Sequence, residues 1–274
     1  MDHWTGFLRL AVQRKKETTI ASEVFHQGAL KVTPAIYFDD PQQPCFYLMS
    51  LGGGYVDGDR YKLEIHLGEQ AQMLLTTQSA TKIFKTINHP AIQEMNIVLE
   101  RGSYLEYMPD PVIAYEHAQY QQNTIVHMNP GSVMIYGDII TPGWSPDGNW
   151  FCYHTLQIKT QVYLEEQLVV FDHLQLRPAN DPMAGIGLLE GYTHLGSMIV
   201  IGERTDPELM ERLSESLKCC SSVAHIGLST LMVPGFSLRV LAYSTQDIEK
   251  IFRSVQKLIR EHWFGKQVTS FRKY

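Results

Sequence analysis

The chain has 274 residues, of which 44% are hydrophobic and 19% are charged, an ordinary composition for a globular protein with a large core. Its 29 acidic and 23 basic residues give a net charge of -6, and no basic block exceeds residues 14–16, which argues against nucleic-acid binding. No apolar stretch approaches the roughly 20 residues that span a bilayer. Residues 1–16 also lack the pattern of a signal peptide, so we expect a cytoplasmic protein that binds no membrane.

Alternating or continuous apolar runs, separated by turn residues, predict strands through most of the chain. The predicted strands are residues 7–12, 19–25, 45–51, 61–67, 72–76, 95–99, 104–108, 124–128, 133–136, 151–160, 162–164, 168–176, 198–201 and 223–231. Strict alternation in 61–67 predicts a half-buried antiparallel strand.

Three segments share one form, an apolar strand, a short polar turn with Gly68, Gly102 or Gly131, and another apolar strand. Such quasi-repeats predict strand pairs stacked in layers, as in a β-solenoid or coiled sandwich.

Two helices are predicted late in the chain. The first begins at Asp206 and Pro207, a capping carboxylate followed by proline at the first helical position. The second has apolar residues at helical spacing over 248–259, a cap at Ser244 or Thr245, and an end at Gly265. We therefore predict a mainly β fold, its layered strands resembling a β-helix or β-sandwich, with two α-helices in the C-terminal third. No linker is visible, and one domain over 1–274 is expected.

The four cysteines, Cys45, Cys152, Cys219 and Cys220, form no CxxC pair and predict free thiols. The vicinal pair Cys219-Cys220 could hold a soft metal, but known thiolate sites use two-residue spacers, which favours a structural role.

The sequence contains no recognisable enzyme motif. The loop from Gly54 to Gly58 is not a phosphate loop, because Asp59 follows where a lysine and a hydroxyl residue are needed. There is no GxSxG elbow and no HExxH zinc motif. The 11 histidines are scattered, and no two are spaced for a local metal site.

Three carboxylates stand beside glycine: Asp59 at a predicted strand entrance, Asp138 at a predicted strand end, and Glu190 before Gly191. Each could simply cap a turn. Alternatively, they and His194 could line an internal, water-filled path that handles a divalent cation by weak, exchangeable ligation.

The most distinctive block spans residues 51–86. It contains Gly53-Gly54, then Gly58-Asp59, and ends in the polar run Thr76-Thr77-Gln78-Ser79-Ala80-Thr81-Lys82. That run lacks the usual turn residues. It is either a partner surface or part of an ion route, or a buried polar corner in which Thr77 and Gln78 satisfy backbone groups. Lys82 is hypothesised to pair with Asp59.

This block resembles the urease accessory protein family called UreD in most bacteria and UreH in some. The resemblance continues in order through residues 105–116, residues 136–143, and Gly191-Tyr192-x-His194, and the closing residues 271–274 also fit. It marks Gly53, Gly54, Gly58, Thr76, Thr77, Gln78, Lys82 and Tyr192 as motif or interaction residues.

The resemblance implies a non-catalytic scaffold that works with UreF-type and UreG-type accessory proteins to activate apo-urease by assisting nickel insertion. It also implies a largely β fold with an internal passage, no permanent cofactor, nickel in transit, and GTP bound only by the GTPase partner. The alternatives are a hydrolase on a β-solenoid scaffold, or a β-structured binding protein with no metal role.

Overall fold

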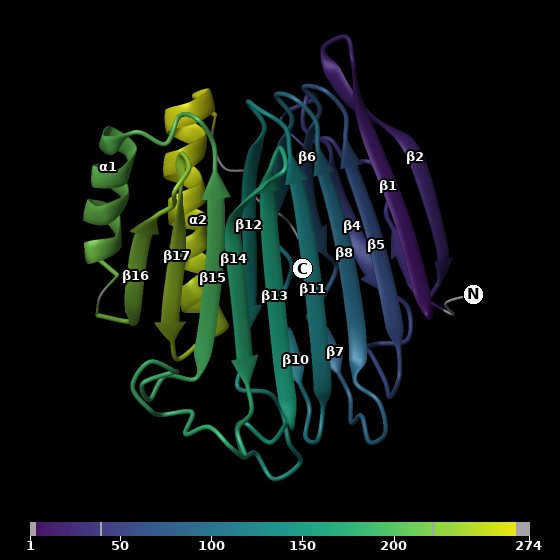
Figure 1. Ribbon diagram of the computed structural model, residues 1–274, viewed down its shortest axis with the longest axis vertical. Coiled ribbons are helices and arrows are strands. Elements are labelled where there is room, and N and C mark those ends of the chain that lie inside the picture. Colours follow the sequence, from purple (N-terminus) through teal and green to yellow (C-terminus); the bar gives the residue numbers. More distant parts are fainter. Residues whose placement is uncertain (1–3, 39, 221, 267–274) are drawn as a thin grey trace.

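The computed structural model describes residues 4–38, 40–220 and 222–266. In these ranges two β-sheets lie face to face, and two helices cover one end of the second sheet (Figure 1). Within the same ranges, no helix combines the length and apolarity needed to cross a membrane. The closing motif at 271–274 lies outside the described residues.

The first sheet has seven strands in the order β14-β13-β11-β8-β5-β1-β2. Its strands are β1 (Gly6–Lys15), β2 (Thr18–Gly28), β5 (Arg60–Leu67), β8 (Ala91–Leu99), β11 (Gln119–Met128), β13 (Thr155–Leu164) and β14 (Gln167–Leu176). Strands β1, β5, β8, β11 and β13 run parallel to one another, and the antiparallel partners β2 and β14 form the two edges.

The second sheet has ten strands, with the path β16-β17-β15-β12-β9-β6-β4-β3 and two short strands beside it. Its strands are β3 (Leu30–Val32), β4 (Cys45–Ser50), β6 (Gln72–Thr77), β7 (Thr81–Ile83), β9 (Tyr104–Tyr107), β10 (Val112–Ala114), β12 (Val133–Ile140), β15 (His194–Ile201), β16 (Ala224–Thr230) and β17 (Gly235–Ala242). Strands β4, β6, β9 and β12 are parallel, whereas β15, β17 and β16 add antiparallel pairs.

The chain winds between the sheets as a β-solenoid, from β5 to β6, from β8 to β9 and from β11 to β12. The turn glycines Gly102 and Gly131 have φ values of 67° and 75°, in the left-handed region that favours glycine. A side chain at Gly131 would lie 3.8 Å from the Gly102 backbone nitrogen, so successive turns stack closely. The predicted layering of quasi-repeats is confirmed.

The predicted antiparallel pairing of 61–67 is wrong, because β5 is parallel to both β1 and β8. Its alternation arises because the solenoid buries one face of this sheet and leaves the other toward solvent. Strands β3, β7 and β10, each of 3 residues, were too short to predict. Strand β17 was also missed. Residues 151–154 precede β13 instead of belonging to it.

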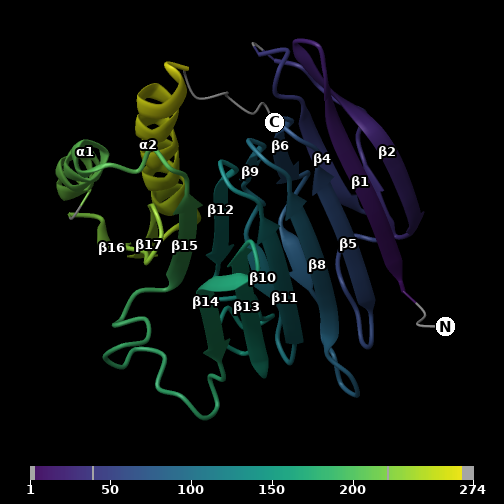
Figure 2. The same ribbon diagram turned by 45° about the horizontal axis from the view of Figure 1, so that its top comes forward.

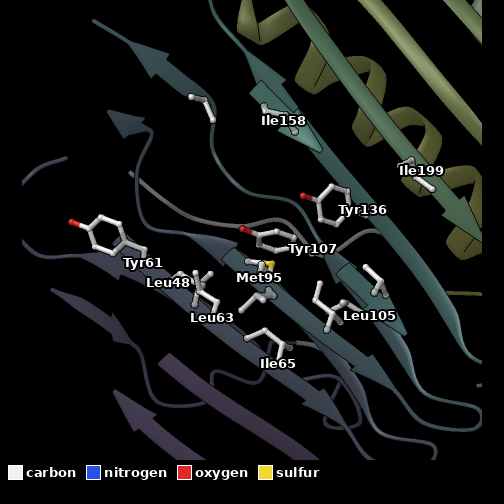
Figure 3. Close-up of a cluster of buried hydrophobic side chains, with 14 of the residues drawn as sticks. Leu48, Tyr61, Leu63, Ile65, Met95, Leu105, Tyr107, Tyr136, Ile158 and Ile199 are labelled. Atoms are coloured by element: carbon white, nitrogen blue, oxygen red, sulfur yellow. The ribbon is translucent and has the colours of Figure 1, made fainter. Parts of the chain in front are cut away.

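The main hydrophobic core fills the space between the sheets, where Leu63, Met95 and Leu105 pack together (Figure 3). A second core lies between the helices α1 (Pro207–Lys218) and α2 (Thr245–Phe264) and strands β15 and β17 (Figure 2). Each helix starts as predicted, with Asp206 capping α1 and Ser244 capping α2. None of the four cysteines, all of which lie in the described ranges, forms a disulfide bond.

A buried ion pair fastens α2 to the sheet. Glu106 on β9 accepts hydrogen bonds from Arg260 and Gln256 of α2, the second at 3.0 Å. The Glu106 and Arg260 side chains are each 2% exposed. Tyr104 and Gln43 also donate to the Glu106 carboxylate.

Candidate functional site: a series of internal cavities

The two halves of the motif block meet through their backbones. The Tyr55 amide donates to the Lys82 carbonyl at 2.8 Å. A β-carbon added at Gly54 would lie 2.6 Å from that carbonyl oxygen, so only glycine permits this approach. Gly53 is exposed with a φ of 81°.

The threonines of the block have internal partners. Thr76 is buried and donates to the Met108 carbonyl at 2.6 Å. Thr77 donates to the Asp110 carboxylate at 2.9 Å and accepts from the Asp110 amide at 2.7 Å. Gln78, by contrast, has an exposed side chain, although its backbone amide donates to the Leu48 carbonyl. Thr77 thus satisfies a backbone group, as the structural interpretation expects, whereas the Gln78 side chain is exposed.

Asp59 closes the glycine loop. Its carboxylate accepts from the Val56 amide at 2.8 Å, the Thr5 hydroxyl at 3.0 Å and the Tyr61 hydroxyl at 3.1 Å. The hypothesised pairing with Lys82 is wrong: in the described ranges these two residues form no ion pair, since Asp59 is engaged by the loop and Lys82 lines a cavity instead.

That cavity has a volume of about 60 Å³ and lies between the sheets. Gly53, Gly54 and Lys82 form its outer wall, and Gln122 and Asp138 line its inner part. The chain therefore places its distinctive surface block over an internal space with a carboxylate at its end.

A polar network surrounds this carboxylate. The Gln122 side-chain amide donates to both oxygens of Asp138 at 3.4 Å and to the Tyr136 hydroxyl at 3.2 Å. The Tyr136 hydroxyl also lies 3.2 Å from the Thr124 hydroxyl, and the Tyr136 ring centroid lies 5.4 Å from that of Tyr107 (Figure 3). Burial raises the pKa of both tyrosines, so they stay protonated.

Asp138 is 6% exposed, and burial raises the pKa of its carboxyl to about 7. Hydrogen bonds from Tyr136 and Gln122 oppose this rise, because they favour the charged form. The group therefore gains or loses its charge near neutral pH.

Two further cavities follow one another on the far side of Asp138, and only the first of them is lined by Asp138 itself. A small one of about 10 Å³ is lined by Asp138, Asp172 and Arg239. An open one of about 350 Å³ shares Arg239 with the small cavity and is also lined by Glu190 and His225. Shared wall residues thus place three cavities next to one another, from the motif block at one end to Glu190 at the other.

The structure does not gather the four predicted metal residues. Asp138 lines two of the cavities and Glu190 lines the outer one. Asp59 caps a loop, and His194 shares a hydrogen bond with the Thr193 hydroxyl at 2.8 Å, with its pKa lowered by burial. In residues 4–38, 40–220 and 222–266, no three His, Cys, Asp or Glu side chains are placed to hold a metal ion.

Glu190 and Tyr192 lie beside the outer cavity. Glu190 accepts from the Gly187 amide at 3.2 Å and lies 3.4 Å from His225. The Tyr192 ring packs on that of Tyr243, with centroids 4.8 Å apart.

Sequence reasoning missed Asp172 and Arg239. In β14, Asp172 lies two residues from both Val170 and Leu174, so it shares their inward face of the strand. A charged residue in that apolar alternation was the signal that could have identified it. Arg239 lies in β17, the strand that was not predicted.

Comparison with known proteins defines the class. The family model described as UreD urease accessory protein matches residues 5–273. The urease accessory protein UreD of Lachnoclostridium phytofermentans is 47% identical over 274 residues, covering 100% of each chain. Those of Bacillus sp. strain TB-90 and Staphylococcus aureus are 41% and 36% identical, each covering at least 98% of both chains.

These matches define a urease accessory protein, which belongs to a class of non-catalytic maturation factors. The chain belongs to the UreD family, and the resemblance found in the motif block is confirmed. The chain is therefore not an enzyme, and the hydrolase alternative is wrong.

Proposed function

We propose that this chain helps to activate apo-urease by passing nickel along the series of cavities, past Asp138. The observation that carries the proposal is the buried Asp138 carboxylate, which lines both the first cavity, under the motif block, and the small cavity next to it. The other carboxylates of the linings, Asp110, Asp172 and Glu190, and the His225 imidazole are spread over the three cavities. In the described ranges, no three such side chains are placed to hold a metal ion. Such a lining favours passage over storage.

The chain acts with UreF-type and UreG-type partners in the cytoplasm. Because its glycine loop continues into Asp59 instead of a phosphate-binding lysine, GTP hydrolysis must come from the partner. Exposed Gln78 flanks the wall of the first cavity and Tyr192 lies beside the outer one. We expect partner proteins to bind at these two ends.

Co-expression tests the role. Apo-urease and the other accessory proteins are expressed with and without this chain, nickel is supplied, and urea hydrolysis is measured. Activity that depends on the chain supports the maturation role, whereas equal activity without it would overturn the proposal.

The nickel route is tested by Asp138→Asn, which keeps the shape of the side chain and removes its charge. We expect activation to fall by about tenfold or more, the usual effect of losing a group that supports metal binding. The matched control is Asp147→Asn in an exposed loop, which should activate like the wild type. If Asp138→Asn folds and also activates like the wild type, nickel does not depend on this carboxylate. A β-structured binding protein without a metal role would then remain.

A further inference from the structure

An ion pair joins the two sheets at the end of the cavity series. Arg239 on β17 donates to the Asp172 carboxylate on β14. The strand registers set this contact. Across the second sheet, Ser197 is opposite both Asp138 and Arg239. Across the first sheet, Asp172 is opposite Thr160. The pair therefore spans the space between the sheets next to Asp138.

The Arg239–Asp172 ion pair lies between the buried Asp138 carboxylate and the open cavity. Asp138 and Arg239 both line the cavity of about 10 Å³, which has room for about one water molecule. Arg239 also lines the open cavity of about 350 Å³. A cation moving from Asp138 toward the outer cavity must pass the Arg239 guanidinium.

The charge on Arg239 opposes that step. A guanidinium stays protonated at all relevant pH values, so it repels a divalent cation throughout. The guanidinium also pairs with the Asp172 carboxylate. Without that pairing, Asp172 would offer the cation a second carboxylate close to Asp138. The Arg239 side chain is 36% exposed, and the open cavity gives it space to swing outward.

We propose that Arg239 is the gate of this route: paired with Asp172 it holds the exit shut, and displaced into the outer cavity it frees Asp172 to bind the passing cation together with Asp138. Arg239 is thus a positioning residue, and Asp172 is the group that it controls. The inference rests on the proposed nickel role.

The test measures Ni²⁺ binding directly, with nickel sulfate and the full chain co-purified with its accessory partners. Arg239→Met removes the charge and keeps the length of the side chain. We expect it to bind Ni²⁺ about tenfold more tightly than the wild type, because a nearby positive charge is gone. Arg239→Lys, which retains the charge, should bind like the wild type.

A double variant identifies the ligand. Arg239→Met combined with Asp172→Asn should lose the gain, because the freed carboxylate is absent. Unchanged binding in Arg239→Met, or a gain that persists in the double variant, would overturn the gate. Arg239→Gln gives a second neutral variant if the methionine variant misfolds, which thermal unfolding reports. If activation needs the chain but Arg239→Met binds nickel like the wild type, only the gate fails. If activation does not need the chain, the proposed function fails whatever the binding result.

Discussion

Replacing the buried arginine on α2 that pairs with Glu106 should destabilise the protein strongly. Arg260→Met leaves the Glu106 carboxylate inside the protein without its charged partner, because both side chains are only 2% exposed. Breaking a buried ion pair in this way costs about 3–5 kcal/mol. Gln256 and Tyr104 still donate to Glu106, which favours the lower part of that range. At about 2 °C per kcal/mol for a chain of this size, the melting temperature should fall by about 6–10 °C.

A double-mutant cycle separates the pair from simple loss of packing. Thermal unfolding is measured for Arg260→Met, Glu106→Gln and the combined variant. The combined loss of unfolding free energy should be smaller than the sum of the single losses by about 0.5–3 kcal/mol. Each single variant leaves one buried charge without its partner, whereas the double variant leaves none. Arg253→Met on the exposed face of the same helix is the matched control and should stay within about 0.5 kcal/mol. Additive losses, or a melting temperature for Arg260→Met within about 1 °C of the wild type, would refute the reasoning.

Three other outcomes are expected. The pKa of Asp138 is raised to about 7 from 3.8, so its charge destabilises the native state progressively as pH rises between these values. Asp138→Asn should therefore raise the free energy of unfolding by up to about 4 kcal/mol above pH 7, and this gain should vanish near pH 4. Urea unfolding at several pH values measures the gain, and a gain that does not vary with pH would contradict the prediction. Gly54→Ala should cost about 1–3 kcal/mol because its β-carbon meets the Lys82 carbonyl, whereas Gly227→Ala, with nothing within 4 Å, should be close to neutral in the same assay. Ser244→Ala should cost about 1 kcal/mol by removing the cap of α2, and an unchanged melting temperature would show that the cap is dispensable.

The sequence anticipated the elements that depend on local chemistry. Alternation identified the inward face of β5, since a strand exposes successive side chains to opposite sides. Caps and helical spacing located α1 and α2, because helix ends have local hydrogen-bonding needs. Glycine-containing turns at repeating intervals predicted the winding of the solenoid. The motif block identified the family.

The direction of neighbouring strands was not available from the sequence, because alternation reports burial and is the same in parallel and antiparallel sheets. Only the tertiary structure placed Asp138 beside Asp172 and Arg239, which come from three different strands. It also separated Asp59 from Lys82, although both belong to one motif. Contacts between distant segments depend on the winding and register of the whole solenoid. The sequence by itself therefore determined the class of fold and the family. The folded chain decided that the Asp138 carboxylate is buried and that the charged Arg239 lies next to it.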